Sequence, residues 1–460
     1  LPFENLSGDD SQEYFADGLT EEMTARLSGF NPQSLAVIAH ISAAKYRGTS
    51  KGATEIGHEL RADYLLESSV RREGNRVRVT AQLIRTSDQV HMWAQTYERE
   101  VGQILPLQQE LAETIARQLQ VTLAQQLLLS KAGSATDAEA HLLYLKGRYH
   151  WNRRTPEALQ QAVVHYQQAL DRDPGYAPAW AGLATAYALF DEYNVLPAHE
   201  SYPRAKAAAL RALELDASQV EARTTLALIR HLYDWDWQGA EQEFQQAIAI
   251  NPNYAVARHW YGMFLMSMGR FAEAREQFHR ALSVDPLSSS LPVALGASYY
   301  HERDFDQAIA EYQRALKLQP LSAGLRFHLG RALVQKGMFQ EAVEEFQAGR
   351  RLSGEGVFTS LAFGYAAAGR AADALRALQE ASRFGQHSPY YLAATHAALG
   401  DEDRALQELE RAFEQRLGRL TFLNVEPMFD PIRDHPRFRD LCRRLGLPEI
   451  RRAAAANSPR

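Results

Sequence analysis

Histidine–glutamate pairs are the residues of this chain whose types and spacing come nearest to known catalytic chemistry. They occur at His58-Glu59, His199-Glu200 and His301-Glu302. A zinc-protease helix needs a second histidine four positions after the first, so that both imidazoles reach one metal, and each pair lacks it. The sequence also lacks the glycine-rich phosphate loops and the Gly-x-Ser-x-Gly nucleophile turn. It therefore predicts a non-enzymatic chain with no catalytic residue, no cofactor and no metal ligand.

The acidic loop Asn5–Asp17 is the candidate for a cation site. Asp9, Asp10 and Glu13 offer carboxylate oxygens of the kind that Ca²⁺ binds, together with Asp17. The alternative is that these groups belong to a loop and to the first turn of a helix, where negative charge suits the helix dipole. The sequence favours this second interpretation.

Two further clusters have a binding and a structural interpretation. Arg71, Arg72, Arg76 and Arg78 form a basic hairpin that would suit anionic lipid or nucleic acid, but a solvated hairpin face explains it more simply. The segment Tyr233–Trp237 carries two tryptophans that would anchor a partner if exposed. The favoured alternative is that these rings pack an insertion against the neighbouring repeat.

A repeat of 34 residues defines the elements that must position any binding residue. Pro252, Pro286 and Pro320 are each 34 positions apart. Between them the same small and aromatic residues recur, at Gly262, Ala274, Phe278 and Ala281, at Gly296, Ala308, Tyr312 and Ala315, and at Gly330, Ala342, Phe346 and Gly349. Two helices per 34 residues, with small residues where they cross, are typical of a tetratricopeptide solenoid. Such arrays bind other molecules and rarely perform chemistry.

The concave groove of that solenoid is the predicted binding site for a protein or peptide partner. In a tetratricopeptide array it is lined by one face of the first helix of each repeat. The 34-residue frame places there His259, Met263, Met266, Val293, Tyr300, His301, Phe327, Arg331, Gln335, Thr359 and Phe363. Because this set lacks the lysines and asparagines that would clamp a carboxylate terminus, we expect apolar anchors. The alternative is that these side chains only pack on one another.

The pattern along the chain predicts a small α/β domain followed by an all-α superhelical solenoid. Residues 1–130 alternate strand-like runs with helical ones and end in a long amphipathic helix. We expect strands at Leu35–Ala39, Asp63–Arg72, Arg76–Thr86 and His91–Arg99, and helices at Gln12–Ser28, Ala53–Leu60 and Ile104–Leu129. A polar linker, Ser130–Asp137, precedes about eight helix pairs at 137–413, a capping segment at 414–450 and a disordered tail at 451–460.

Composition limits the class of protein and its surroundings. The 460 residues are 46% hydrophobic and 23% charged with a net charge of −6, which indicates a folded chain without a broad nucleic-acid surface. Cys442 is the single cysteine, which excludes an internal disulfide. No apolar run approaches the roughly 18–20 residues of a membrane span. Because the chain begins at Leu1 without a methionine, we expect a fragment of a longer protein. Its location is open, cytoplasmic or, with an upstream membrane helix, periplasmic, and a homo-oligomer is possible.

Several sequence runs resemble one bacterial family. They are Leu1–Asp9, Glu13–Glu22, Tyr64–Arg72, Thr80–Ile84 and His91–Ala94 in the first part, and Lys146–Tyr149, Tyr233–Trp237 and Phe429–Arg433 in the repeats. The chain resembles proteins that join a TolB-like amino-terminal α/β domain to tetratricopeptide repeats. In that family a winged-helix, Ser/Thr kinase or nucleotide cyclase module often lies upstream. The resemblance implies a signalling or transcription-regulatory scaffold. Alternatively, the α/β domain senses a small molecule and the repeats relay the signal.

Overall fold

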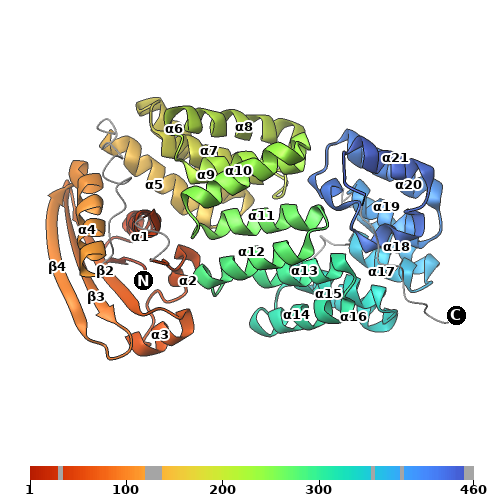
Figure 1. Cartoon of the computed structure of the whole chain (residues 1–460), viewed down its shortest axis with the longest axis horizontal. Coiled ribbons are helices and arrows are strands. Elements are labelled where there is room, and N and C mark those ends of the chain that lie inside the picture. The colour runs from red at the N-terminus through yellow and green to blue at the C-terminus, as the bar shows by residue number, and fades with distance from the viewer. Residues whose placement is uncertain (30–34, 120–136, 354–357, 384–387, 450–460) are drawn as a thin grey trace. The chain divides into compact units, whose positions relative to one another are not determined.

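The computed structural model describes residues 1–29, 35–119, 137–353, 358–383 and 388–449 (Figure 1). Contacts divide the chain into two compact units. The first unit comprises Leu1–Ile229, Gly239–Arg258 and Arg280–Ser288, and the second comprises Arg230–Gln238, His259–His279 and the described residues of Ser289–Arg460. Each unit is described by itself. Within the described residues, no helix is both long enough and apolar enough to cross a membrane.

A four-stranded sheet opens the first unit, in the order β1 (Glu4–Asn5), β2 (Tyr64–Glu73), β3 (Arg76–Arg85) and β4 (His91–Glu100). β1 runs parallel to β2, and β2, β3 and β4 are antiparallel neighbours. Along β3, Val77, Val79 and Ala81 are buried while the residues between them are exposed. This alternation directs one face of the strand into the core. The helices of this part are η1 (Asp10–Gln12), α1 (Glu13–Gly29), α2 (His40–Ala44), α3 (Ala53–Leu60), η2 (Val101–Gln103) and α4 (Ile104–Gln118).

The prediction of a strand at Leu35–Ala39 is wrong, because the backbone of this run bonds to the repeats and not to the sheet. The Leu35 carbonyl accepts a hydrogen bond from the Asn253 side chain at 3.0 Å. The Ala39 N–H donates to the Val284 carbonyl at 2.7 Å. The strands predicted after it lie within one or two residues of β2, β3 and β4. The predicted helix end at Leu129, the linker and the tail at 451–460 lie outside the described residues.

The α/β part and the first repeats share one hydrophobic core. Phe15 and Leu19 of α1 belong to the same buried cluster as Leu145 of α5 (Ala138–Asn152) and Tyr166 of the next helix. The two helices approach so closely that a Cβ on Gly18 would lie 2.7 Å from a methyl carbon of Leu145. α1 therefore completes the core of the first repeats as well as that of the sheet.

Eight helix pairs follow in the described residues (Figure 1). They are α5 with α6 (Pro156–Arg172), α7 (Ala177–Leu189) with α8 (Ala198–Leu215), α9 (Val220–Ile229) with α10 (Trp237–Ile250), α11 (Ala255–Ser267) with α12 (Phe271–Val284), α13 (Leu291–Glu302) with α14 (Phe305–Leu318), α15 (Ala323–Gln335) with α16 (Phe339–Ser353), α17 (Phe358–Ala367) with α18 (Ala371–Arg383), and α19 (Pro389–Ala398) with α20 (Glu402–Glu414). A π-helical turn, η4 (Arg230–Asp234), follows α9, and η6 (Gly418–Phe422), η7 (Pro427–Ile432) and α21 (Pro436–Arg444) follow α20.

The 34-residue period reflects a glycine of each first helix that receives an aromatic ring from the second helix. A Cβ on Gly296 would lie 2.5 Å from the Tyr312 ring, and one on Gly330 would lie 2.7 Å from the Phe346 ring. The Phe346 ring also lies against Gly364 of the next first helix. Since interiors are packed to crystal-like density, no larger residue fits these positions without displacing the ring.

We expect Gly296→Ala to destabilise the second unit by about 1–3 kcal/mol, because the added methyl group overlaps a fully buried tyrosine ring. The matched control is Gly324→Ala, at the start of α15, where a Cβ meets open space. That change should leave stability unchanged or raise it slightly, since alanine favours helix. Urea unfolding measures both variants. Equal midpoints for Gly296→Ala and the wild type would contradict the packing role of the glycine.

Candidate binding face of the repeats

The first helices α11, α13, α15 and α17 of the second unit carry the predicted binding residues, and we call the side that they share with α19 the first-helix face. A segment from beyond the repeats lies against it. This return segment, Gly418–Ile432, comprises η6, a short link and η7, and η7 packs on α19. Leu420, Leu423 and Phe429 of the segment are fully buried in one cluster with Tyr390 of α19. The chain therefore covers part of its own binding face.

A buried carboxylate fixes the return segment to two first helices. Tyr300 Oη of α13 donates to Glu426 Oε1 at 2.7 Å, and Arg331 Nη1 of α15 donates to Glu426 Oε2 at 3.3 Å. The side chain of Glu426 is 2% exposed and that of Arg331 is 9% exposed. Both charges are thus removed from water, and each needs the other to offset its desolvation.

Electrostatics keep this carboxylate ionised. Burial acts to raise the pKa of Glu426, but Arg331 and the Tyr300 hydrogen bond outweigh it, so the pKa lies below its usual value. Burial lowers the pKa of the neighbouring His301 to about 4, so that ring is neutral at neutral pH. Arg331 is therefore the cation that holds Glu426.

Aromatic and ionic contacts extend the docking on both sides of Glu426. The Phe422 ring stacks on His301 with centroids 5.4 Å apart and meets His231 edge-on at 6.3 Å. Farther along, both oxygens of Asp430 accept from the Arg303 guanidinium, at 2.9 and 3.2 Å. The segment thus contacts η4, α13, α15 and α19.

The structure brings only part of the predicted groove set together. Tyr300, His301 and Arg331 meet at Glu426 and Phe422. Two others face the second helix of their own pair, since Phe327 stacks on Phe346 with centroids 6.3 Å apart and His259 meets Phe278 edge-on at 6.1 Å. The remaining members are the buried Met266, Thr359 and Phe363 and the half-buried Met263, Val293 and Gln335.

Two consequences follow for the predicted groove. Its eleven residues do not form one exposed surface, because six of them are buried within the chain. Arg331 and Tyr300 bind the side-chain carboxylate of a residue of this same chain, whereas the expectation concerned a carboxylate terminus of a partner and stays a prediction. That these residues hold a partner remains a prediction.

In the first unit, a second buried arginine also binds a glutamate from outside the repeats. Arg148 of α5 pairs with Glu21 of α1 and with Glu221 of α9. Asn152 Nδ2 donates to the other oxygen of Glu21 at 3.1 Å. Burial acts to raise the pKa of Glu21, but Arg148 outweighs it and the pKa lies below its usual value. An acidic residue from outside the repeats is again fixed to a first helix.

The two arginines occupy one position of the repeat. Arg148 directly follows Gly147, and Arg331 directly follows Gly330, the glycines that receive Tyr166 and Phe346. At the same position the other first helices with a crossing glycine have leucine, methionine, alanine or tyrosine, at Leu183, Met263, Ala297 and Tyr365. Sequence reasoning missed Arg148 and Glu426. A charged residue next to the crossing glycine was the signal for the arginines, but no local signal marks Glu426.

Models of the tetratricopeptide repeat match residues 232–293 and 293–356. The helix pairs and the glycine–aromatic crossings of this region agree with that match. Residues 232–356 are tetratricopeptide repeats. Tetratricopeptide repeats are typically non-catalytic, and they bind protein partners.

The curated relatives of this chain include proteins with regulatory names. It is 35% identical over 231 residues, 50% of this chain and 39% of the relative, to a Rhizobium meliloti protein named as an adenylate cyclase. It is 24% identical over 291 residues, 62% of this chain and 51% of the relative, to the transcriptional regulator HilA of Salmonella paratyphi A. The chain therefore spans about two fifths to half of the length of these relatives.

Among solved structures, the chain is similar to yeast Tom70, with 19% identity and a TM-score of 0.43 over 68% of this chain and 69% of that one.

The tryptophans of Tyr233–Trp237 pack on the C-terminal part of the second unit. Trp235 stacks on Phe413 with centroids 5.1 Å apart, and Trp237 Nε1 donates to the Leu445 carbonyl at 3.1 Å. Packing was the favoured prediction, but the partner is not a neighbouring tetratricopeptide repeat. The rings fix η4 to the residues on both sides of the return segment.

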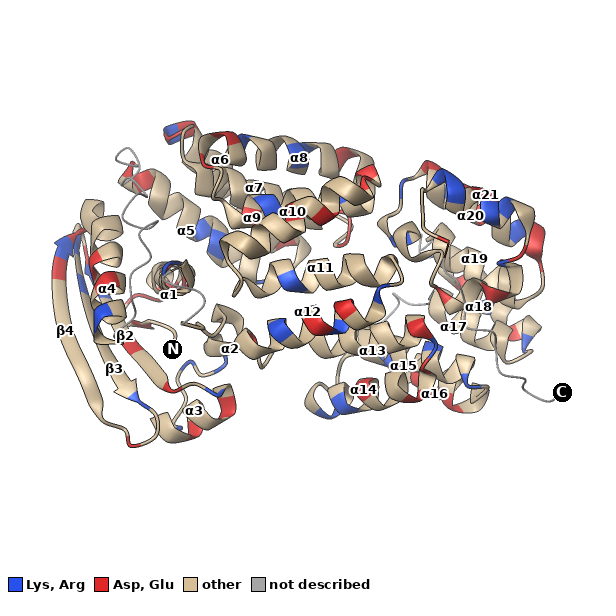
Figure 2. Cartoon of the chain, viewed as in Figure 1, with Lys and Arg blue, Asp and Glu red and all other residues tan. Residues whose placement is uncertain are grey.

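The acidic loop and the basic hairpin are engaged within the first unit. Asp9 caps η1 by accepting from the Ser11 N–H at 2.9 Å, and Glu13 and Asp17 both pair with Arg47. In the hairpin, Arg72 donates to Tyr14 Oη at 3.2 Å and Arg78 lies 3.6 Å from Glu98. Acidic and basic residues are interspersed along the helices of both units (Figure 2).

We expect Glu426→Gln to destabilise the second unit by about 3 kcal/mol, because it leaves the buried Arg331 charge without its counter-charge. The matched control is Glu341→Gln on the exposed side of α16, which should change stability by less than about 0.5 kcal/mol. Urea unfolding followed by tryptophan fluorescence measures both. If the two variants unfold alike, the pairing of Glu426 with Arg331 does not hold the return segment.

Proposed function

We propose that this chain is a non-catalytic protein-binding scaffold in bacterial signalling or transcriptional regulation, and that its partner docks on the first-helix side of the repeats. One observation carries the proposal. In each unit, a segment from outside the repeats already docks there through a glutamate held by a buried arginine, Glu21 at Arg148 and Glu426 at Arg331. The repeats thus have the chemistry to hold a foreign segment of similar composition.

The regulatory setting is supported by the relatives. One is named as an adenylate cyclase and another as a transcriptional regulator, and both align over half or more of this chain. The alignments cover about two fifths to half of those proteins, so their activities are not transferred to this chain. The alignments therefore support a binding region that is common to proteins with different outputs.

The half-buried members of the predicted groove are the residues that a partner would reach first. They are Met263, Val293 and Gln335, because His259 and Phe327 face the second helix of their own pair. Tyr300, His301 and Arg331 are covered by the return segment, so a partner contacts them only if that segment leaves.

Photo-crosslinking from the first-helix face tests the proposal. We expect benzoylphenylalanine at Met263 of α11 or at Gln335 of α15 to capture the same protein in bacterial cells, because both half-buried side chains lie on first helices. The same probe at Gln313, exposed on the second helix α14, is the matched control and should not capture it.

The captured protein, once purified, should bind the unmodified chain in isothermal titration. Equal capture from Gln313, or no binding by the purified protein, would contradict a partner site on the first-helix face.

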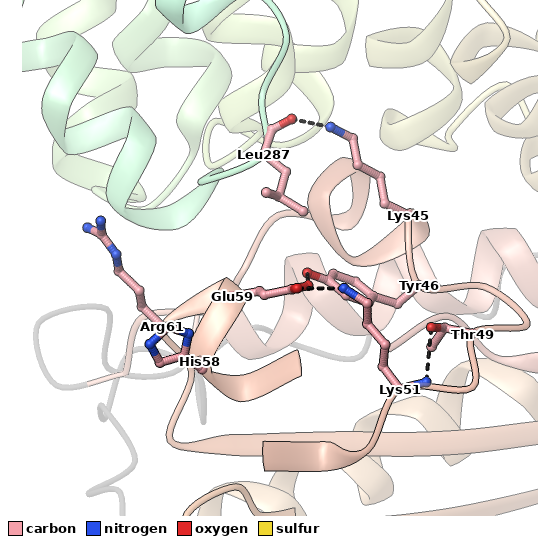
Figure 3. Close-up of a pocket in the computed structure, with 8 residues that line it drawn as sticks. All are labelled: Lys45, Tyr46, Thr49, Lys51, His58, Glu59, Arg61 and Leu287. Atoms are coloured by element: carbon pink, nitrogen blue, oxygen red, sulfur yellow. Dashed lines mark hydrogen bonds and ion pairs between the residues drawn. The ribbon is translucent and has the colours of Figure 1, made fainter. Parts of the chain in front are cut away.

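A second candidate function is the sensing of a small anion by the α/β part, which resembles TolB-like domains. A cavity of about 650 Å³ lies in the first unit (Figure 3). Its lining is rich in cationic groups and comprises Lys45, Tyr46, Thr49, Lys51, His58, Glu59, Arg61 and Leu287. Glu59 accepts from Lys51 and from Tyr46 Oη, so part of this charge is already neutralised. The repeats would then relay the signal.

Thermal shift separates the two candidates. It requires the full chain, because the α/β part shares its core with α5 and the following helices. Under the sensing function, inorganic phosphate or a dicarboxylate raises the melting midpoint of the wild type but not that of Arg61→Asn. Under the scaffold function, neither anion raises the melting midpoint of the wild type more than that of Arg61→Asn.

A further inference from the structure

The Trp151 ring of α5 carries two arginines. The Arg148 guanidinium carbon lies 4.8 Å from the ring centroid, and that of Arg154 lies 3.7 Å from it. Arg154 follows α5 with a φ of +53°, at the same position after the crossing glycine as Gly269, Arg303 and Gly337, which also have positive φ. A left-handed conformation is uncommon for arginine, and it carries this side chain back over the tryptophan.

The two arginines differ in their partners. Arg148 is neutralised by Glu21 and Glu221. For the Arg154 side chain, the described part of the chain offers neither a hydrogen bond nor an ion pair, and its contact is the face of Trp151. The exposed Glu192 acts on Arg154 only from beyond ion-pair distance. Burial lowers the pKa of Arg154, since no adjacent carboxylate offsets it.

Two buried donors beside this pair also lack acceptors. Within the described residues, Trp151 Nε1 and Tyr166 Oη have no hydrogen-bond partner, although Trp151 is 5% exposed and Tyr166 is fully buried. A buried donor without a partner costs about 1–3 kcal/mol.

The same chemistry is satisfied elsewhere in the chain. In the second unit, Arg331 lies 5.0 Å over the Tyr300 ring and binds the Glu426 carboxylate. In the first unit, Arg148 lies over Trp151 and binds Glu21. A guanidinium stacked on an aromatic face keeps its N–H groups in plane, where a carboxylate can accept two of them. Arg154 has this arrangement and is only half-buried, so a carboxylate from solution can approach it.

We infer that Arg154, stacked on the Trp151 ring, forms a binding site for an acidic side chain of the partner peptide. The inference rests on the proposed scaffold function and names the chemistry of its partner. Arg154 pairs with the carboxylate, and Trp151 fixes the plane of the guanidinium. The left-handed turn at Arg154 thereby places a second arginine on the Trp151 ring, beside Arg148 of α5.

Fluorescence anisotropy with two labelled peptides tests the site on the full chain. The probe is a nine-residue peptide with the sequence of Thr421–Phe429, which presents one glutamate after an aromatic residue, and its twin carries glutamine in place of Glu426. We expect the glutamate peptide to bind the wild type at least tenfold more tightly than its twin. Arg154→Gln should weaken binding of the glutamate peptide at least tenfold and bring the two peptides to similar affinity.

The matched control is Arg153→Gln, the adjacent exposed arginine over Tyr149, which should bind the glutamate peptide like the wild type. Arg154→Lys keeps the charge without the planar fork and should lose affinity only partly. Unchanged urea midpoints for these variants separate lost binding from lost folding. If Arg154→Gln unfolds at a lower urea concentration than the wild type, the two peptides are compared on Arg154→Lys instead.

Equal binding of the glutamate peptide by Arg154→Gln and the wild type would overturn the site, as would equal affinity of the two peptides for the wild type. Stronger competition by inorganic phosphate than by glutamate at equal concentration would also overturn it. If the peptide does not bind at Arg154 but crosslinking from Met263 and Gln335 captures the partner, the scaffold function stands. If the peptide binds at Arg154 but the crosslinking captures no partner, the partner site on the second unit is rejected instead.

Discussion

A buried arginine that follows the crossing glycine of a first helix is the interaction on which the rest of this molecule depends. The glycine admits an aromatic ring from the second helix, and the next side chain must then face the first-helix side. At Arg148 and Arg331 that side chain is a cation that the fold removes from water. An unpaired charge in such a place costs several kcal/mol, so each arginine requires a carboxylate. The chain supplies Glu21 before the repeats and Glu426 after them.

These pairs determine position more than they add stability. A buried ion pair gains little over well-packed apolar residues of the same volume, because desolvation offsets most of the attraction. The apolar contacts of Leu420, Leu423 and Phe429 provide the larger favourable term, since each removes a whole hydrophobic side chain from water. Hydrophobic burial alone would tolerate a shift of the return segment along the first helices. The hydrogen bonds of Glu426 to Tyr300 and Arg331 form in one position of that segment. The same reasoning applies to α1 on α5.

How much of this structure could be predicted from the sequence depends on how far apart in the chain the interacting residues lie. The 34-residue period predicted the glycine–aromatic crossings, and the alternation along Arg76–Thr86 predicted β3, because both patterns are local. Leu35–Ala39 has a strand-like composition, yet its hydrogen bonds go to Asn253 and Val284, more than 200 positions away. The pairing of Glu426 with Tyr300 spans 126 positions and leaves no periodic signal. For the same reason, the residues that cover the first-helix face were not predictable as a set.

Amide hydrogen exchange of the full chain, followed by mass spectrometry, tests the central claim most directly. If the buried arginine holds the return segment, residues 418–432 exchange slowly in the wild type, at rates close to those of α13 and α15. Arg331→Met should accelerate exchange in 418–432 and leave α5 unchanged, while Arg148→Met should accelerate exchange in α1 and leave 418–432 unchanged. Exchange of residues 418–432 at the rate of an unprotected peptide in the wild type would contradict the account.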